Sequence, residues 1–306
     1  MKNMNLEKLT QQLELQDFSL GLGGCKMTQN TFDSCGFDLV VFDGKDVSPQ
    51  VINFENNLVV LHHAKFSEKN PMKLLQYENI KILQDDSWEL KLLISKIHEK
   101  HSSLIYDYAK TSLMESIFAC KKSKMSLENG GLFASCWLKT SSFFLSDAIS
   151  SLNGKKIGPT HMLNFLRKLE KNPINEKILA ITETVGIERS STILLERMLK
   201  STIGFSDLVE KNNFSLLIRQ TYDNFIKNSM LSDCYFYLGY LNKQNFIKIK
   251  DSIEKNEDLF HILKIGFDVD SDETLIENHI RLLEDSCSQI QDIISNKSQF
   301  SPNLLK

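Results

Sequence analysis

The chain has 306 residues, of which 42% are hydrophobic and 25% charged, with a net charge of −3 and a pI near 6.2. This composition is ordinary for a globular protein and excludes both an intrinsically disordered chain and a strongly basic nucleic-acid coat. No stretch approaches the roughly 18 consecutive apolar residues of a transmembrane helix, and the first residues lack a signal-peptide core. We therefore expect a cytoplasmic protein with no membrane partner.

The N-terminal third alternates short apolar runs with turns. A helix is predicted over residues 6–15, and β-branched apolar runs predict strands over 18–22, 37–42, 51–54, 58–61 and 80–83. Asp85 and Asp86 follow the last run, where acidic side chains favour the start of a helix. These elements indicate a small mixed β-sheet covered by helices, which makes the fold class α+β.

From about Trp88 onward the apolar residues recur at helical spacing. We therefore expect a large all-helical C-terminal domain over residues 101–306, after an α/β core over residues 1–100. Asn172-Pro173 suggests a sub-boundary near residue 172. The last predicted helix, 272–295, is long and has one apolar face, so a homodimer formed through it is one expectation.

A glycine pair lies between the first two predicted strands. Gly23 and Gly24 follow the first strand, and after a spacer of about a dozen residues Asp38 begins the apolar run of the second. A glycine turn lets the backbone close around a phosphate without a Cβ in the way, and a strand-borne carboxylate can hold a metal ion against that phosphate.

This order and spacing resemble the nucleotidyltransferase superfamily related to DNA polymerase β, in particular its minimal and antibiotic-modifying members. The resemblance covers about residues 1–100, a third of the chain. It implies a nucleotidyltransferase-like core in which Gly23 and Gly24 bind the phosphates of a nucleoside triphosphate. It also implies that Asp38 is the catalytic carboxylate and binds Mg²⁺.

The sequence departs from that pattern at the other carboxylates. The position two residues before Asp38, where the family has an aspartate, is Gly36, and the strand 57–63, where the third acid is expected, contains none. Asp43 and Glu55 are the substitutes that remain for metal binding. Asp43 lies five residues after Asp38, so strand alternation puts it on the opposite face, roughly 17 Å away along an extended chain.

Basic side chains are concentrated between residues 110 and 168, where lysine predominates. Lys110, early in the first helix after the core, is the candidate to contact a bound nucleotide, while solvated helix faces explain most of the others. The scarcity of arginine and the core-like spacing of the aromatic residues argue against nucleic acid as the partner.

Histidine and cysteine show no recognisable metal-binding spacing. His62 and His63 are adjacent on a predicted strand, so their side chains face opposite sides and a joint metal site is disfavoured. The six cysteines form no Cys-x-x-Cys pair, which argues against a zinc ribbon or a disulfide framework. Cys25 and Cys35 flank the glycine loop, and a regulatory thiol there is the alternative to a buried structural role.

Two functions follow from these patterns. The first is Mg²⁺-dependent transfer of a nucleotidyl group from a nucleoside triphosphate to a small molecule or a protein. The second is a fold of the same kind that has lost catalysis and serves as a nucleotide-binding or protein-interaction module. The missing carboxylates favour the second, and neither the acceptor nor the base preference can be read from the sequence.

Overall fold

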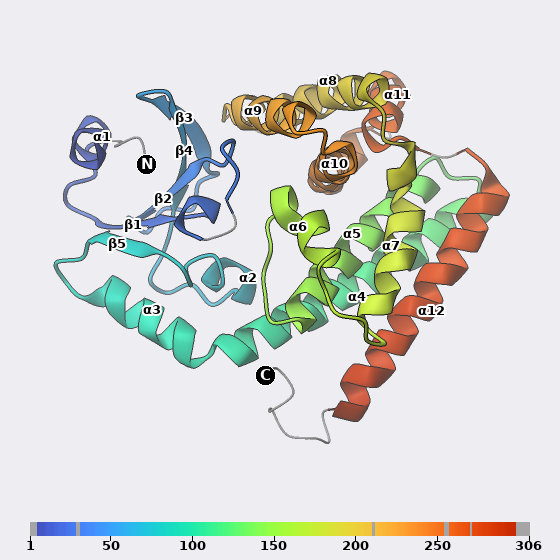
Figure 1. Cartoon of the computed structure of the whole chain (residues 1–306), viewed down its shortest axis with the longest axis horizontal. Coiled ribbons are helices and arrows are strands. Elements are labelled where there is room, and N and C mark those ends of the chain that lie inside the picture. The colour runs from blue at the N-terminus through green and yellow to red at the C-terminus, as the bar shows by residue number, and fades with distance from the viewer. Residues whose placement is uncertain (1–4, 29–30, 210–211, 254–256, 270, 298–306) are drawn as a thin grey trace. The chain divides into compact units, whose positions relative to one another are not determined.

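The computed structural model describes residues 5–28, 31–209, 212–253, 257–269 and 271–297. The chain divides into two compact units. Unit 1 contains residues 1–104 together with 206–224, and unit 2 contains residues 105–205 together with 225–306. The chain has a mixed sheet in its N-terminal part and helices thereafter (Figure 1), which confirms the α+β class expected from the sequence.

Unit 1 is built on a five-stranded sheet with the order β3-β4-β2-β1-β5. β1 pairs antiparallel with β2 and β5, β3 pairs antiparallel with β4, and β2 runs parallel to β4. The strands lie within two residues of the apolar runs that predicted them: β1 (Ser19–Gly23), β2 (Phe37–Phe42), β3 (Gln50–Phe54), β4 (Asn57–His63) and β5 (Lys81–Gln84).

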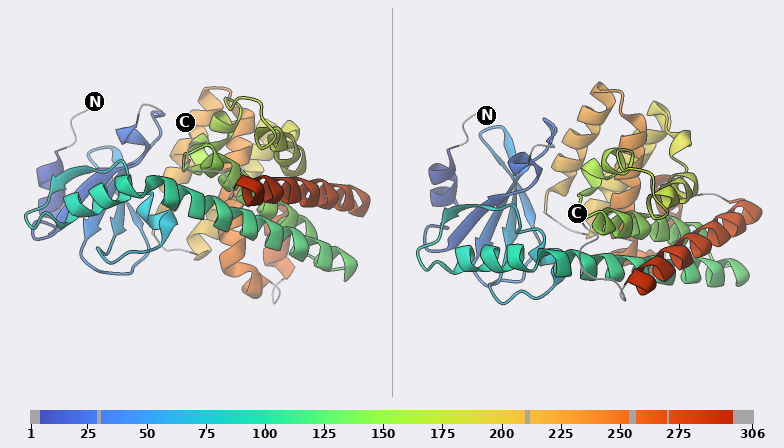
Figure 2. Two further views of the ribbon diagram at one scale, coloured as in Figure 1. Left: turned by 90° about the horizontal axis from the view of Figure 1, so that it is seen from below. Right: turned by 60° about the horizontal axis from the view of Figure 1, so that its bottom comes forward.

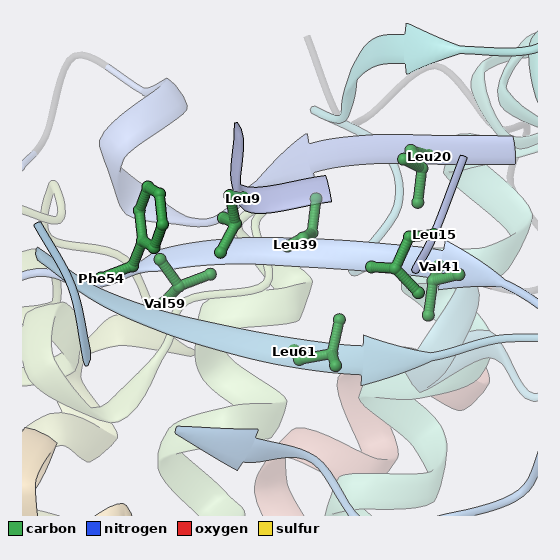
Figure 3. Packing of buried hydrophobic residues seen from close by; sticks show 8 residues of the cluster. All are labelled: Leu9, Leu15, Leu20, Leu39, Val41, Phe54, Val59 and Leu61. Carbon is green, nitrogen blue, oxygen red and sulfur yellow. The ribbon is translucent and has the colours of Figure 1, made fainter. Parts of the chain in front are cut away.

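One face of the sheet is covered by α1 (Leu6–Gln12). Figure 3 shows the cluster on this face, in which alternate residues of the central strands meet the helix and the segment that follows it. Alternation along a strand sends successive side chains to opposite faces, so this cluster takes every second residue of β2 and β4. Its buried members are Leu9, Leu15, Leu20, Leu39, Val41, Phe54, Val59 and Leu61.

The opposite face is covered at its two ends by different helices. Near β5, Val40 and Phe42 pack with the segments around α2 (Pro71–Leu74) and α3 (Glu89–Glu99), and α3 can be followed beside the sheet in both views of Figure 2. Near β3, Val51, Leu58 and Val60 pack against the start of α9 (Phe214–Lys227). The sheet positions between these two clusters are available for a site.

The start of α3 is fixed by the aspartate that the sequence places there. Asp85 accepts hydrogen bonds from the backbone N–H groups of Leu90 at 3.1 Å and Lys91 at 2.9 Å. It also accepts one from the Ser19 hydroxyl at 3.1 Å, which ties the helix to β1. A carboxylate at a helix N-terminus satisfies otherwise unpaired N–H groups, as expected.

Residues 206–224 belong with the sheet, although Gln220 is 186 positions from its partner Ser34 in the sequence. The Val51 N–H donates to the Asn212 carbonyl at 2.9 Å, and Gln220 Nε2 donates to the Ser34 carbonyl at 3.0 Å. The compact units therefore differ from the contiguous division at residue 100. The reason is that these hydrogen bonds join residues far apart in the sequence, and no local sequence pattern predicts them.

Unit 2 is helical throughout its described residues, with α5 packed against α6, α7, α10, α11 and α12. Residue 172 lies inside this unit, because α5 and α7 on either side of it pack together. Within the described residues, no helix combines the length and apolarity needed to cross a membrane. Its elements are α4 (His101–Glu128), α5 (Ala134–Leu152), α6 (Pro159–Leu166), η2 (Asn175–Lys177), α7 (Ile178–Val185), η3 (Ile187–Arg189), most of α8 (Thr192–Val209), α10 (Leu231–Ile253), α11 (Glu257–Phe267) and α12 (Glu273–Lys297).

The core of unit 2 contains two buried lysines, each with polar partners. Lys139 Nζ donates to the carbonyls of Phe267 and Asp268, both at 2.8 Å, at the end of α11. Lys243 Nζ lies 3.1 Å from an oxygen of the buried Asp147, which also accepts from the Tyr240 hydroxyl. Burial lowers the pKa of Lys243, and Asp147 opposes that change. These partners offset the cost of burying charge.

We predict that Gly21→Ala destabilises the sheet. A Cβ at Gly21 would lie 2.2 Å from Cγ2 of Ile80, at the point where the β1–β5 register shifts. Overpacking of this kind costs about 1–3 kcal/mol. Urea denaturation followed by circular dichroism measures the loss.

The companion change Ile80→Leu removes the branch at Cβ while conserving volume, so the double variant should recover part of the lost stability. A Gly21→Ala protein with an unchanged urea midpoint would show that the two residues are not in this contact.

Candidate functional site

The glycine pair and Asp38 meet at one end of the β1–β2 pairing. Gly23 is the register partner of Asp38, and Gly24 follows with φ of +84°. A Cβ added at Gly24 would lie only 2.2 Å from Oδ2 of Asp38. Glycine is therefore required at position 24 for two reasons: its backbone takes the left-handed conformation, and a side chain would collide with the Asp38 carboxylate. The structure thus brings together three of the residues that the sequence singled out for phosphate and metal binding, Gly23, Gly24 and Asp38.

His62 is a second polar side chain at this place. β4 lies beside β2 in parallel register, and Asp38 pairs with Val60 two residues before His62. His62 Nε2–H donates to Oδ1 of Asp38 at 3.0 Å, and both side chains are partly exposed. His62 therefore lies on the strand where the resemblance places a third carboxylate, and its partnership with Asp38 depends on the pairing of β4 with β2.

Asp43 lies on the other face of the sheet. Its carboxylate is 2.7 Å from Nδ1 of His63 and 3.2 Å from Nζ of Lys45, and its side chain is 1% exposed. His63 shares the face of Val59 and Leu61, whereas His62 shares the face of Val60. Asp43 therefore faces away from Asp38, as strand alternation predicts, and the two carboxylates do not share one site.

Glu55 contacts residues at the N-terminal end of α1. It lies in the two-residue β3–β4 turn with φ of +49°, next to Asn56 with φ of +62°. Its carboxylate accepts from the Asn5 N–H at 3.3 Å and lies 3.5 Å from Lys8 Nζ, at the α1 end of the unit. The turn dictates this position, because both of its residues take the left-handed conformation of a tight hairpin. Glu55 is therefore held at the α1 side of the sheet by Asn5 and Lys8, and its role as a metal ligand stays a prediction.

Lys110 belongs to unit 2, on α4. Its side chain is exposed, and Nζ lies 4.4 Å from the centroid of the Tyr106 ring, one turn earlier on the same helix. Its predicted contact with a nucleotide stays a prediction, since the structure gives it a local partner only.

The thiol beside the glycine pair is kept protonated. A hydrogen bond with Cys35 and burial both raise the pKa of Cys25. The thiolate is the reactive form of cysteine, so a raised pKa suppresses nucleophilic and redox chemistry at neutral pH. This environment favours the structural role for Cys25 over the regulatory one.

The donor set at Gly24, Asp38 and His62 fits one metal ion held mainly by a nucleotide, because Mg²⁺ in such sites uses one or two carboxylates plus phosphate oxygens. It does not fit a two-metal centre, which needs carboxylates shared between two ions a few ångströms apart. The arrangement can cradle a phosphate against one carboxylate and place an imidazole next to it.

Asp43 generates a prediction about pH. Burial raises the pKa of Asp43, but hydrogen bonds from the Lys45 backbone and from His63 outweigh it, so the pKa is lowered overall. A carboxyl group whose pKa is lower in the folded state than in the unfolded state stabilises the protein at any pH above its unfolded-state pKa. This stabilisation is lost as the pH falls through its folded-state pKa. The loss therefore falls below about pH 4.

We expect Asp43→Asn to cost about 1.5–3 kcal/mol near neutral pH, the range for charge-assisted hydrogen bonds, and less at pH 3. Urea midpoints between pH 3 and 6 measure this. Asp46→Asn is the matched control, because the Asp46 side chain is 76% exposed and pairs only with surface lysines. Equal destabilisation by Asp43→Asn at both ends of the range would contradict the prediction.

No protein-family model matches the sequence, and no curated protein is similar enough to match it. Among solved structures, a nucleotidyltransferase-like protein from Exiguobacterium sibiricum aligns with 83% of this chain and 89% of its own. The identity is 9% and the TM-score is 0.34. So distant a likeness carries no argument about the activity of this chain.

Proposed function

We propose that the protein is a nucleotidyltransferase-like nucleotide-binding module that holds a nucleoside triphosphate with one divalent cation at Gly23, Gly24 and Asp38. The observation that carries this proposal is the contact of Gly24 with Asp38, where no side chain fits between backbone and carboxylate. A bare turn facing a carboxylate is the arrangement that a phosphate and its cation require.

Each residue has a distinct task in this proposal. The glycine turn lets the backbone of Gly24 lie against the Asp38 carboxylate, which a Cβ at Gly24 would prevent. The phosphates bind to the backbone of this turn. Asp38 supplies one negative oxygen to the cation that accompanies the phosphates, and His62 orients the carboxylate through its hydrogen bond to Oδ1. The cation, when bound, offsets the charge of the triphosphate.

Binding is favoured over two-metal transfer because the other carboxylates are engaged elsewhere. Asp43 is held by His63 and Lys45 on the opposite face, and Glu55 is held by Lys8 and Asn5 in the β3–β4 turn. Asp38 is left as the carboxylate at the glycine turn.

The Asp38–His62 pair favours nucleotidyl transfer as a second candidate function. A histidine whose one ring nitrogen is hydrogen-bonded to a carboxylate is oriented to accept a proton at the other. His62 would take the proton of an acceptor hydroxyl through Nδ1 while that oxygen attacks the α-phosphorus and pyrophosphate leaves. The acceptor is a small molecule or a protein with an accessible hydroxyl group.

Calorimetric titration with MgATP tests the binding proposal. We expect measurable binding that Asp38→Asn and Gly24→Ala each weaken at least about tenfold, equivalent to about 1.4 kcal/mol. Chelation of Mg²⁺ should weaken binding to the wild type more than to Asp38→Asn.

Asp43→Asn is the control for charge removal, because Asp43 lies on the other face and should leave the affinity unchanged. Circular dichroism confirms that each variant is folded. Absence of heat at millimolar nucleotide, or an Asp38→Asn protein with wild-type affinity, would overturn the proposal.

Incubation with α-labelled nucleoside triphosphates and a metabolite extract tests the second candidate. Transfer through His62 predicts a labelled product that His62→Ala abolishes without a tenfold loss of nucleotide affinity. A rate equal to that of the wild type in His62→Ala rules out this mechanism, and so does the absence of product from protein that binds MgATP.

A further inference from the structure

A groove of about 680 Å³ runs along α3 in unit 1, away from the glycine turn. Its walls come from α3, from the first turn of α4, from the loop that precedes α2 and from α2 itself. The volume is within the range of small-molecule sites, about 300–1,000 Å³. Its apolar lining is Phe66, Leu74, Leu92, Leu93, Ile97 and Leu104.

The apolar lining is accessible rather than fully packed. Leu92 is 58% exposed, and Leu93 and Phe66 are partly buried against the core cluster near β5. Ile97 is buried and forms the floor. An aliphatic chain in the groove would cover surface that folding leaves in water, at about 25 cal/mol for each Å² buried.

Three lysines surround the groove without acidic partners. Lys96 and Lys100 stand one helical turn apart on the α3 side, and Lys69 comes from the loop before α2. Within the described part of the chain, none of their Nζ atoms has a carboxylate oxygen within 4.0 Å. Their charge is therefore free to meet an anion.

The two glutamates that line the groove, Glu68 and Glu89, do not neutralise the positive charge of Lys96 and Lys100. The Glu68 carboxylate already has partners: it accepts hydrogen bonds from the N–H groups of Lys69 and Asn70 and lies 3.4 Å from Nζ of Lys73. Glu89 stands at the opposite end of α3 from Lys100 and accepts from the Ser87 hydroxyl at 3.2 Å. The C-terminal half of the α3 wall is thus positive and the stretch before it is apolar.

We propose that this groove binds an anionic amphiphile with a single aliphatic chain, such as a fatty-acid carboxylate or an alkyl phosphate. The chain lies against Leu92, Leu93 and Phe66, and the head group meets Lys96 and Lys100. The groove uses no residue of the glycine turn and neither Asp38 nor His62, so it is independent of the nucleotide proposal.

Calorimetry with decanoate and decyl phosphate, below their aggregation concentrations, tests this inference and distinguishes the two head groups. Decyltrimethylammonium has the same chain with the opposite charge, and butyrate has the same carboxylate with a short chain. We expect binding of at least one decyl anion, and at least about tenfold weaker binding of both controls.

Variants then locate the site. Lys96→Gln/Lys100→Gln and Leu92→Glu should each weaken decyl-anion binding at least about tenfold, and both alter exposed side chains that the fold does not need. Lys81→Gln removes an exposed lysine of the same unit outside the groove and should have no effect. Lys96→Glu/Lys100→Glu should reverse the preference toward decyltrimethylammonium.

The proposal is overturned if neither decyl anion binds at millimolar concentration, or if decyltrimethylammonium binds as tightly as the decyl anions do. It is also overturned if Lys81→Gln weakens binding as much as the groove variants do. Circular dichroism and thermal unfolding of every variant ensure that a lost signal reflects the groove and not a lost fold.

Discussion

The backbone at Gly24 comes so close to the Asp38 carboxylate that no side chain fits between them, and the candidate site depends on this approach. Antiparallel pairing sets Gly23 opposite Asp38, and the left-handed conformation of Gly24 carries the chain past the carboxylate. Any Cβ there would displace Asp38 from His62 as well, so one steric constraint governs the turn, the carboxylate and the imidazole together.

Strand alternation then divides the polar residues of β2 and β4 between two environments. The adjacent residues His62 and His63 each meet an aspartate, but on opposite faces of the sheet. The Asp38–His62 pair is partly exposed between two apolar clusters, whereas the Asp43 side chain is nearly inaccessible beside His63 on the opposite face. The first pair is open to a ligand, and the second stabilises the end of β2.

The sequence allowed the strands and the Gly24–Asp38 partnership to be predicted, because both depend on local patterns: apolar β-branched runs, a glycine turn and a fixed spacing. His62 could not be recognised in the same way. Its hydrogen bond to Asp38 forms only because β4 lies beside β2 in parallel register. That pairing depends on the packing of the whole sheet and not on the local sequence. The attachment of residues 206–224 to the sheet is non-local for the same reason.

The helix α3 shows why a second ligand is physically reasonable in the same unit. Its inward side chains Leu90 and Ile97 are buried against the sheet, and Asp85 anchors its first turn through both carboxylate oxygens. The helix is therefore held without help from its outer face. Leu92 and Lys96 on that face contribute little to packing, yet they combine apolar surface with unpaired charge. Folding does not explain that combination, whereas recognition of an amphiphile does.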